Sequence, residues 1–138
     1  MIVYLDSSVI LRVLLGQPAK LKEWTLVEKG IVSSVVEVEC LRTLDRLRLR
    51  ENIPETDIAA RRESVYLIMD SVEMVEMTSI VLARASQPLP VSVGTLDAIH
   101  LATAMVWREQ TGDALIMATH DAGLGQAARS VGLPVISC

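Results

Sequence analysis

Short apolar runs separated by helix-like stretches constrain the fold of this chain more than any other feature. We expect strands at Ile2–Leu5, Ile31–Ser33, Val72–Met77, Ala114–Ala118 and Leu133–Ile136. The stretches between them are predicted helices at Ser7–Leu15, Ala19–Lys29, Ser34–Arg50, Glu55–Met69, Thr78–Ser86, Thr95–Gln110 and Asp121–Val131. This alternation predicts an α/β fold, a doubly wound sheet with right-handed crossovers, with Ala114–Ala118 as a central strand.

Glycines and capping residues set the predicted helix ends. Gly16 closes the first helix and Gly30 the second. Residues 34–37 match a capping box, in which the Ser34 hydroxyl and the Glu37 carboxylate each satisfy an end amide. This gives Glu37 a structural role and leaves Glu39 without one. Two prolines and a glycine make residues 87–94 a loop, expected near the site, and Thr95 is expected to cap the next helix.

Composition supports one domain, residues 1–138. Apolar residues make up 51% of the chain and Phe is absent, so small aliphatic side chains must build the core. That suits a parallel sheet covered on both faces. The formal net charge of −4 argues weakly against gripping nucleic acid by overall charge. It does not exclude a nuclease, because metal-holding carboxylates count as negative while their metals are not counted.

The chain carries no sign of export or membrane insertion. Asp6 interrupts the first apolar run, and no run approaches the roughly 20 residues of a membrane span. Cys40 and Cys138 are isolated, without paired spacing. We therefore expect a cytoplasmic protein whose two cysteines are reduced thiols, one buried and one at the tail.

Four carboxylates stand where strands end or helices begin. Asp6 follows the first strand, Glu39 lies in the first turns of its helix, Asp97 begins a nearly all-apolar helix, and Asp121 follows the fourth strand. In an α/β fold such positions converge at the carboxyl edge of the sheet. Clustered carboxylates repel unless something positive lies between them, and Mg²⁺ is held by such oxygen ligands. The pattern therefore indicates metal-assisted chemistry on phosphate.

Each acid also has a structural interpretation. Asp6 and Asp121 are placed to cap helices, and an acid such as Asp97 in a first helical turn is favoured by the helix dipole. Yet Ser7 and Ser8 can cap the first helix without a negative charge. The helix after Asp97 is nearly all apolar, which implies burial, and a buried carboxylate without a partner is costly. A metal is the simpler explanation.

One helical face adds basic residues to this pattern. Thr43, Arg46 and Arg50 follow Glu39 at helical spacings and share its face. Arginine binds phosphate through paired hydrogen bonds, although a solvated face with ion pairs is an equal alternative. The candidate substrate-binding residues are Ser8, Thr119, Arg46 and Arg50.

The two histidines have no zinc-site spacing. His100 lies one turn after Asp97 and is expected to be a satisfied core histidine rather than a ligand. His120 precedes Asp121 and either contacts substrate or lies in a solvated loop.

The expected chemistry is phosphodiester hydrolysis with one or two Mg²⁺ or Mn²⁺ ions. Such ions lower the pKa of a water and clamp the charged oxygens. Asp6 and Asp97 are the first candidates for direct metal ligands. Glu39 and Asp121 would complete the set, directly or through waters, or activate the attacking water.

The chain resembles PIN-domain ribonucleases, in particular the VapC toxins of bacterial and archaeal toxin–antitoxin pairs. The matching pieces are Ile2–Ser8, Ser33-Ser34 with Glu39 and Leu41-Arg42, Leu96–Ala104, and Thr119–Asp121 with Gly132–Val135. The resemblance implies a three-layer α/β/α fold with a central parallel sheet of four to five strands. It also implies Mg²⁺- or Mn²⁺-dependent cleavage of RNA, a homodimer and an inhibiting antitoxin. It carries Asp6, Glu39, Asp97 and Asp121 over as the catalytic and metal-binding residues.

Two other functions remain open from the sequence. An α/β phosphatase would use Asp6 as a covalent nucleophile, but it would want a second Asp shortly afterwards and a suitably placed Lys, whereas Ser7 and Ser8 follow Asp6. A catalytically silent binding module would keep the fold without the chemistry, and the presence of all four acids argues against such decay.

Overall fold

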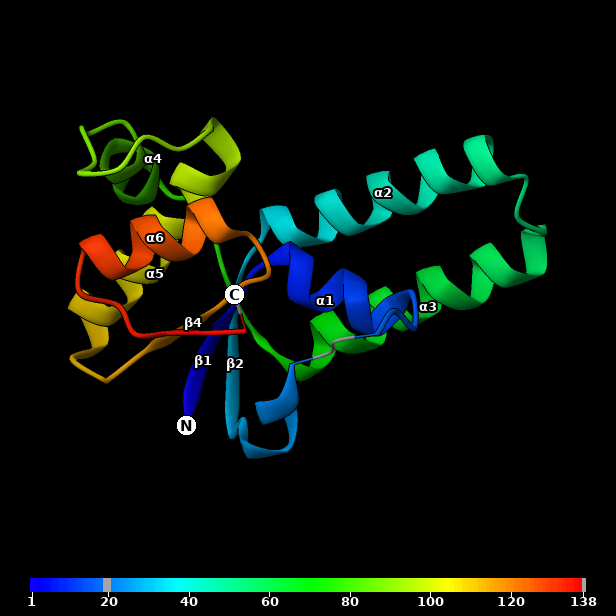
Figure 1. Cartoon of the computed structure of the whole chain (residues 1–138), viewed down its shortest axis with the longest axis horizontal. Helices are drawn as coiled ribbons and strands as arrows, with labels where there is room; N and C mark the ends of the chain where they lie inside the picture. Colours follow the sequence, from blue (N-terminus) through cyan, green and yellow to red (C-terminus); the bar gives the residue numbers. More distant parts are fainter. Residues whose placement is uncertain (19–20, 138) are drawn as a thin grey trace.

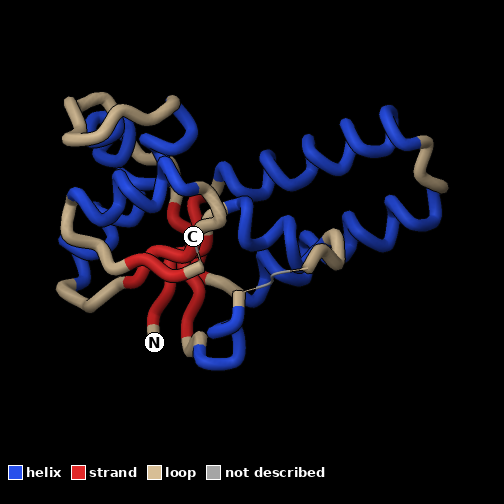
Figure 2. Tube along the Cα trace, in the orientation of Figure 1, coloured by secondary structure: helices blue, strands red, loops and turns tan. Residues whose placement is uncertain are grey.

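A parallel sheet forms the centre of the molecule. The computed structural model describes residues 1–18 and 21–137. The strands are β1 (Ile2–Leu5), β2 (Lys29–Ser33), β3 (Glu73–Val75), β4 (Ile116–Ala118) and β5 (Val135–Ile136). All five pair in parallel in the order β3-β2-β1-β4-β5, drawn in red in Figure 2. The predicted parallel sheet is confirmed, and β4 pairs with a strand on each side, as predicted for a central strand, while β1 is the middle strand of the five.

Helices cover both faces of this sheet. They are α1 (Ser7–Leu14), α2 (Val35–Glu51), α3 (Glu55–Ser71), α4 (Ser79–Ala85), α5 (Thr95–Thr111) and α6 (Ala122–Ser130). One buried cluster joins the sheet to α1, α2 and α3, and another joins it to α5 and α6. Helix α4 packs against α5, and α2 and α3 run side by side away from the sheet (Figure 1). The three-layer α/β/α arrangement is thereby confirmed.

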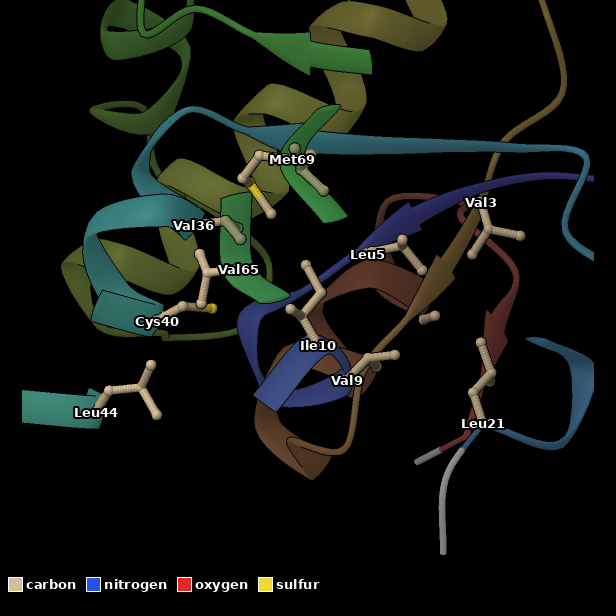
Figure 3. Close-up of a cluster of buried hydrophobic side chains, with 12 residues drawn as sticks. Val3, Leu5, Val9, Ile10, Leu21, Val36, Cys40, Leu44, Val65 and Met69 are labelled. Atoms are coloured by element: carbon tan, nitrogen blue, oxygen red, sulfur yellow. The ribbon is translucent and has the colours of Figure 1, made fainter. Parts of the chain in front are cut away.

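Alternation along β1 shows how the sequence builds two cores. Val3 and Leu5 belong to the cluster under α1–α3, whereas Tyr4 belongs to the cluster under α5 and α6. Successive side chains of a strand point to opposite faces, so a run that is apolar throughout must be covered on both. Figure 3 shows Val3 and Leu5 beside Val9 and Ile10 of α1.

The winding of the chain reverses beside β1. From β1 the chain moves outward to β2 and β3, then crosses through α4 and α5 to β4 on the other side of β1. Ligands of open α/β sheets bind at such a reversal, outside the carboxyl ends of the strands. The backbone amide of Asp6 donates to the carbonyl of Ala118 at 3.1 Å, so the ends of β1 and β4 lie together there.

The helix predicted at Ala19–Lys29 is wrong. Residues 19–20 lie outside the described part, and the segment beyond them contains a short 3₁₀ helix, η1 (Lys22–Leu26), before β2 begins at Lys29. Gly30 is a strand residue rather than a helix stop. A Cβ there would lie 3.0 Å from side-chain atoms of both Leu5 and Val72, so glycine lets the strand pack closely.

Two predicted helix caps are also wrong. Ser34 already has helical angles, φ −56° and ψ −23°, and its side chain makes no capping hydrogen bond. Instead, the Ser33 hydroxyl accepts from the first amide of α2 at 3.3 Å. The capping box with Glu37 therefore does not form. Helix α5 has Gly94 as its N-cap rather than Thr95.

Other local predictions are confirmed. Residues 87–94 form no helix or strand, as predicted, and Gly112, with φ 73°, ends α5 in a left-handed conformation. Cys40 is fully buried, as expected of one thiol, while Cys138 lies outside the described residues. No helix within residues 1–18 and 21–137 combines the length and apolar character needed to span a bilayer.

Candidate active site

Asp6 lies at the end of β1 and is held by hydrogen bonds. Only 4% of the residue is exposed. Its Oδ1 accepts from the Ser7 amide at 2.8 Å, so it does cap α1. Its Oδ2 accepts from the hydroxyls of Ser8 at 2.7 Å and Thr119 at 2.9 Å. These donors replace the water that the carboxylate loses and fix its orientation.

Glu39 projects from the first turns of α2 toward Asp6. Its Oε2 accepts from the Ser7 hydroxyl at 3.2 Å, and its Oε1 lies 2.6 Å from His100 Nε2. The same nitrogen lies 3.6 Å from Asp6 Oδ1. On the other side of the ring, Nδ1 and the Tyr4 hydroxyl oxygen are 2.7 Å apart. A series of hydrogen bonds therefore runs from the buried Tyr4 hydroxyl through the His100 ring to the Glu39 carboxylate.

His100 is the ionisable base in contact with these carboxylates. Burial alone would lower its pKa, but the hydrogen bond to Glu39 and the charges of Asp6, Glu39 and Asp97 raise it above the ordinary value. Burial raises the pKa of Tyr4, and the charge of Asp6 adds to that. His100 is a buried, satisfied histidine, as expected from the sequence.

Asp97 lies in the first turn of α5, and Asp121 is the N-cap of α6. Asp121 caps α6, because its Oδ1 accepts from the Leu124 amide at 2.9 Å. The Asp97 carboxylate makes no hydrogen bond within the described residues. Its pKa is raised by burial and then by the charges of Asp121 and Asp6, an effect that the charge of His100 only partly offsets. The neighbouring groups therefore compensate the negative charge of Asp97 poorly.

All four acids line one cleft of about 550 Å³ at the switch point. The structure thus brings Asp6, Glu39, Asp97 and Asp121 together as the sequence predicted. Within the described part of the chain, no three His, Cys, Asp or Glu side chains converge closely enough to hold a metal ion by themselves. The donor set is nevertheless all oxygen and carries excess negative charge, which fits a hard cation such as Mg²⁺ that keeps several of its waters.

Thr119 and Ser8, two of the predicted substrate contacts, both hydrogen-bond to Asp6. The Thr119 side chain is fully buried, and its hydroxyl donates to Asp6 while accepting from the Asp121 amide at 3.0 Å. The Ser8 hydroxyl likewise donates to Asp6 and accepts from the His120 amide at 2.9 Å, although Ser8 also lines the cleft. Thr119 therefore does not reach the cleft, because its hydroxyl is used between β1 and β4.

Only part of the predicted arginine face on α2 lies beside the acidic cleft. Glu39, Thr43 and Arg46 line a second cavity of about 250 Å³ on α2, and the Arg46 guanidinium donates to the Thr43 hydroxyl at 3.1 Å. Arg50, in the last turn of α2, is exposed and lines neither this cavity nor the acidic cleft. The cause is the length of α2, which runs beyond the sheet (Figure 1).

Sequence reasoning missed Tyr4 and Ser7 and left His120 open. The signal for Tyr4 was a phenol inside an otherwise apolar strand, since a buried Tyr hydroxyl needs a partner. His120 is partly buried, with Nδ1 3.2 Å from the Ser137 hydroxyl, and its Nε2 is buried without a hydrogen-bond partner among the described residues. Burial, followed by the charge of Arg12, lowers the pKa of His120.

Comparison with known proteins agrees with this geometry. The PIN domain family model matches residues 3–130, so the chain belongs to the PIN-domain family. Ribonuclease VapC47 from Mycobacterium tuberculosis (strain CDC 1551 / Oshkosh) is 27% identical over 138 residues, covering 98% of this chain and 96% of the relative.

Solved structures share the fold at low sequence identity. FitAcB from Neisseria gonorrhoeae superposes with a TM-score of 0.70 at 18% identity, covering 97% of this chain and 96% of that one. A toxin–antitoxin complex from Klebsiella pneumoniae gives a TM-score of 0.69 at 12% identity, covering 97% and 95%. These two similarities establish the fold alone.

Proposed function

We propose that this chain is a divalent-cation-dependent endoribonuclease and the toxin of a type II toxin–antitoxin pair. The observation that carries the proposal is the single cleft at the switch point, lined by Asp6, Glu39, Asp97 and Asp121. Membership of the PIN-domain family supports it, as do the ribonuclease relative and the structural similarity to a toxin–antitoxin complex.

In this proposal Mg²⁺ or Mn²⁺ is held by Asp97 and Asp121 together with Asp6 and Glu39, directly or through waters. When bound, the cation lowers the pKa of a water and stabilises charge on the phosphate and the leaving oxygen. Asp97 offers both carboxylate oxygens, and Asp121 offers Oδ2, since Oδ1 caps α6. Ser7, Ser8 and Thr119 keep Asp6 oriented. His100 Nε2 holds Glu39 Oε1.

The partners belong to the same proposal. The substrate is RNA, an antitoxin protein inhibits the enzyme, and the chain forms a homodimer in the cytoplasm. Exposed apolar side chains on α3 and α4, including Leu67 at 62% and Ile80 at 59%, are available for such contacts. Light scattering of the chain with and without its antitoxin measures both assemblies.

The phosphatase alternative is disfavoured by the surroundings of Asp6. Both carboxylate oxygens of Asp6 already accept hydrogen bonds, and the residue is almost fully buried, which is unfavourable for a nucleophile that must attack a phosphate in line. No lysine is among the described residues that line the cleft. A phosphoaspartate trapped at Asp6 would revive this alternative.

The test is cleavage of a panel of structured RNAs by antitoxin-free protein with Mg²⁺, Mn²⁺ or EDTA. We expect metal-dependent cleavage that is lost in Asp6→Asn and Asp97→Asn. Asp70→Asn is the matched control, because Asp70 is an exposed carboxylate on α3 outside the cleft. Equal activity in all four proteins would mean contamination and would refute the proposal. RNA or antitoxin binding without any cleavage would favour the silent binding module.

A further inference from the structure

A second cavity adjoins the acidic cleft along α2. Both cavities are lined by Ser7, Leu11, Glu39 and Leu96, so they share a wall. The second one, which we call the Arg46 pocket, is lined in addition by Arg42, Thr43, Arg46, Val35 and Val38. An RNA strand that occupies the acidic cleft and continues past Glu39 therefore enters the Arg46 pocket.

The charges in the Arg46 pocket are unevenly compensated. Arg42 pairs with Asp45 at 3.3 Å, and Asp45 also accepts from Arg48 at 3.1 Å. Arg46 has no carboxylate partner among the described residues and hydrogen-bonds only to the Thr43 hydroxyl. The guanidinium has five N–H donors in a fixed fork, so most of them remain available to a ligand. Arg46 is thus an exposed cation in a pocket that shares Glu39 with the acidic cleft.

The Arg46 pocket also has accessible apolar side chains beside its polar ones. Val38 is 59% exposed and Leu96 is 47% exposed. None of the described residues lining it is aromatic or has a side-chain amide, so it offers neither a surface on which a base can stack nor an amide to read a base edge. At about 250 Å³ it is slightly smaller than a typical small-molecule site, which suits one nucleotide unit.

We infer that the Arg46 pocket is a subsite for the RNA strand: Arg46 and Thr43 bind a backbone phosphate next to the one in the acidic cleft, and the attached sugar and base lie against Val38 and Leu96. This inference rests on the proposed ribonuclease function. Charge complementarity favours RNA over a protein partner. A phosphate chain entering a cleft of four carboxylates is repelled along its path, and Arg46 is the arginine that has no carboxylate partner among the described residues lining the Arg46 pocket.

Such a contact positions the strand without reading its sequence. Phosphate contacts set register and orientation, whereas specificity requires contacts to base edges. The Arg46 contribution should therefore be the same for different RNA sequences and should weaken with salt. Arg50 provides an internal comparison, because it has the same charge and lies on the same helix but outside the pocket.

The experiment measures binding of a fluorescein-labelled, randomised 12-nucleotide single-stranded RNA to protein carrying Asp97→Asn, which is expected not to cleave. In that background we expect Arg46→Ala to raise the Kd about tenfold. Arg46→Lys should recover most of the loss, and Arg50→Ala should match its parent. The salt dependence, as the slope of log K against log salt, should fall by about 0.7 for Arg46→Ala. Oligo(A) and oligo(U) should show the same loss.

Steady-state cleavage by Arg46→Ala with an otherwise wild-type sequence separates the two proposals. We expect a raised KM with little change in kcat. If wild type binds RNA through Arg46 but cleaves nothing, the ribonuclease proposal fails while the subsite stands. If Arg46→Ala and Arg50→Ala bind RNA equally, or if no RNA binds, the subsite is refuted. If Arg46→Ala loses only antitoxin binding, the Arg46 pocket is a protein-docking site instead.

Discussion

The two halves of the acidic cleft are built differently. On one side, Asp6 and Glu39 are each held by hydrogen bonds from side chains of other elements, Thr119 and His100 among them. On the other side, Asp121 uses one oxygen as a helix cap, and Asp97 makes no hydrogen bond within the described residues. The same residue type therefore serves two purposes. The first pair is fixed before any ligand arrives, and the second pair keeps oxygens available for one.

The two pairs of carboxylates also differ in how far their negative charge is compensated. The donors around Asp6 and the His100 ring beside Glu39 offset the charge of the first pair. The pKa of Asp97 is raised, first by burial and then by its acidic neighbours, so repulsion is concentrated at its carboxylate. A cation bound at Asp97 would relieve that repulsion.

The largest effects are expected when one acid in each half of the cleft is neutralised, which tests directly whether the two halves differ. We expect both Asp6→Asn and Asp97→Asn to lose at least about 100-fold in RNA cleavage. Their stabilities should differ. Asp6→Asn replaces one of the two accepting oxygens with an NH2 group, which then faces either the Ser7 amide or the hydroxyls of Ser8 and Thr119, and it should lower the free energy of unfolding by about 1–3 kcal/mol. Asp97→Asn removes repulsion and should not lower it. Urea unfolding of the metal-free proteins measures this, and equal destabilisation would contradict the account.

The hydrogen bonds of the first half can be tested at Thr119. Thr119→Val keeps the shape but removes the donor to Asp6 and the acceptor of the Asp121 amide. We expect a loss of about 1 kcal/mol in stability and about tenfold in cleavage rate. Thr119→Ser retains the hydroxyl and should recover most of both. If the Val and Ser variants behave alike, the hydroxyl is not what orders Asp6.

The repulsion at Asp97 predicts a pH dependence with a definite sign. A carboxyl whose pKa is raised by folding stabilises the native state when it is protonated. That contribution is complete below the ordinary value of 3.8 and is lost as the pH rises through the raised value. Without metal, Asp97→Asn should therefore match wild type at low pH and become the more stable of the two toward neutral pH. A stability difference that does not change with pH would argue against repulsion at this site.

The smallest expected effect concerns Cys40, which comes directly after Glu39 and lies on the buried side of α2. Burial, together with the charges of Glu39 and Asp6, raises the pKa of this thiol to about 12. In a Cys138→Ser variant, where only Cys40 can react, we expect almost no labelling by a maleimide at pH 8 until the protein unfolds. Fast labelling of the folded protein would mean that the Asp6 half opens readily.

Much of this arrangement can be predicted from local sequence patterns. The four acids could be placed because strand ends and helix starts fix where side chains meet at the edge of a parallel sheet. The shared face of Glu39, Thr43 and Arg46 is a consequence of helical spacing, and the Arg46 pocket confirms it. Arg50 satisfies the same spacing, but the sequence does not tell where α2 leaves the body of the protein.

The rest depends on contacts between distant segments. Tyr4 and His100 are 96 residues apart, and they meet only because α5 covers the face of β1 to which Tyr4 points. The predicted helix cannot extend to Lys29 because Lys29 and Gly30 pair with β1. The Ser33 hydroxyl, rather than that of Ser34, accepts a hydrogen bond from the first amide of α2, and which serine does so depends on where β2 ends.

The most direct test of the account is calorimetric titration of Mn²⁺ into the metal-free protein, its Asp97→Asn variant and the Asp70→Asn control. If Asp97 is the carboxylate kept available for a cation, wild type and Asp70→Asn should bind alike. Asp97→Asn should then bind at least about tenfold more weakly. Binding by Asp97→Asn that is as tight as that of wild type would contradict the account, because the cation would then not depend on the open half of the cleft.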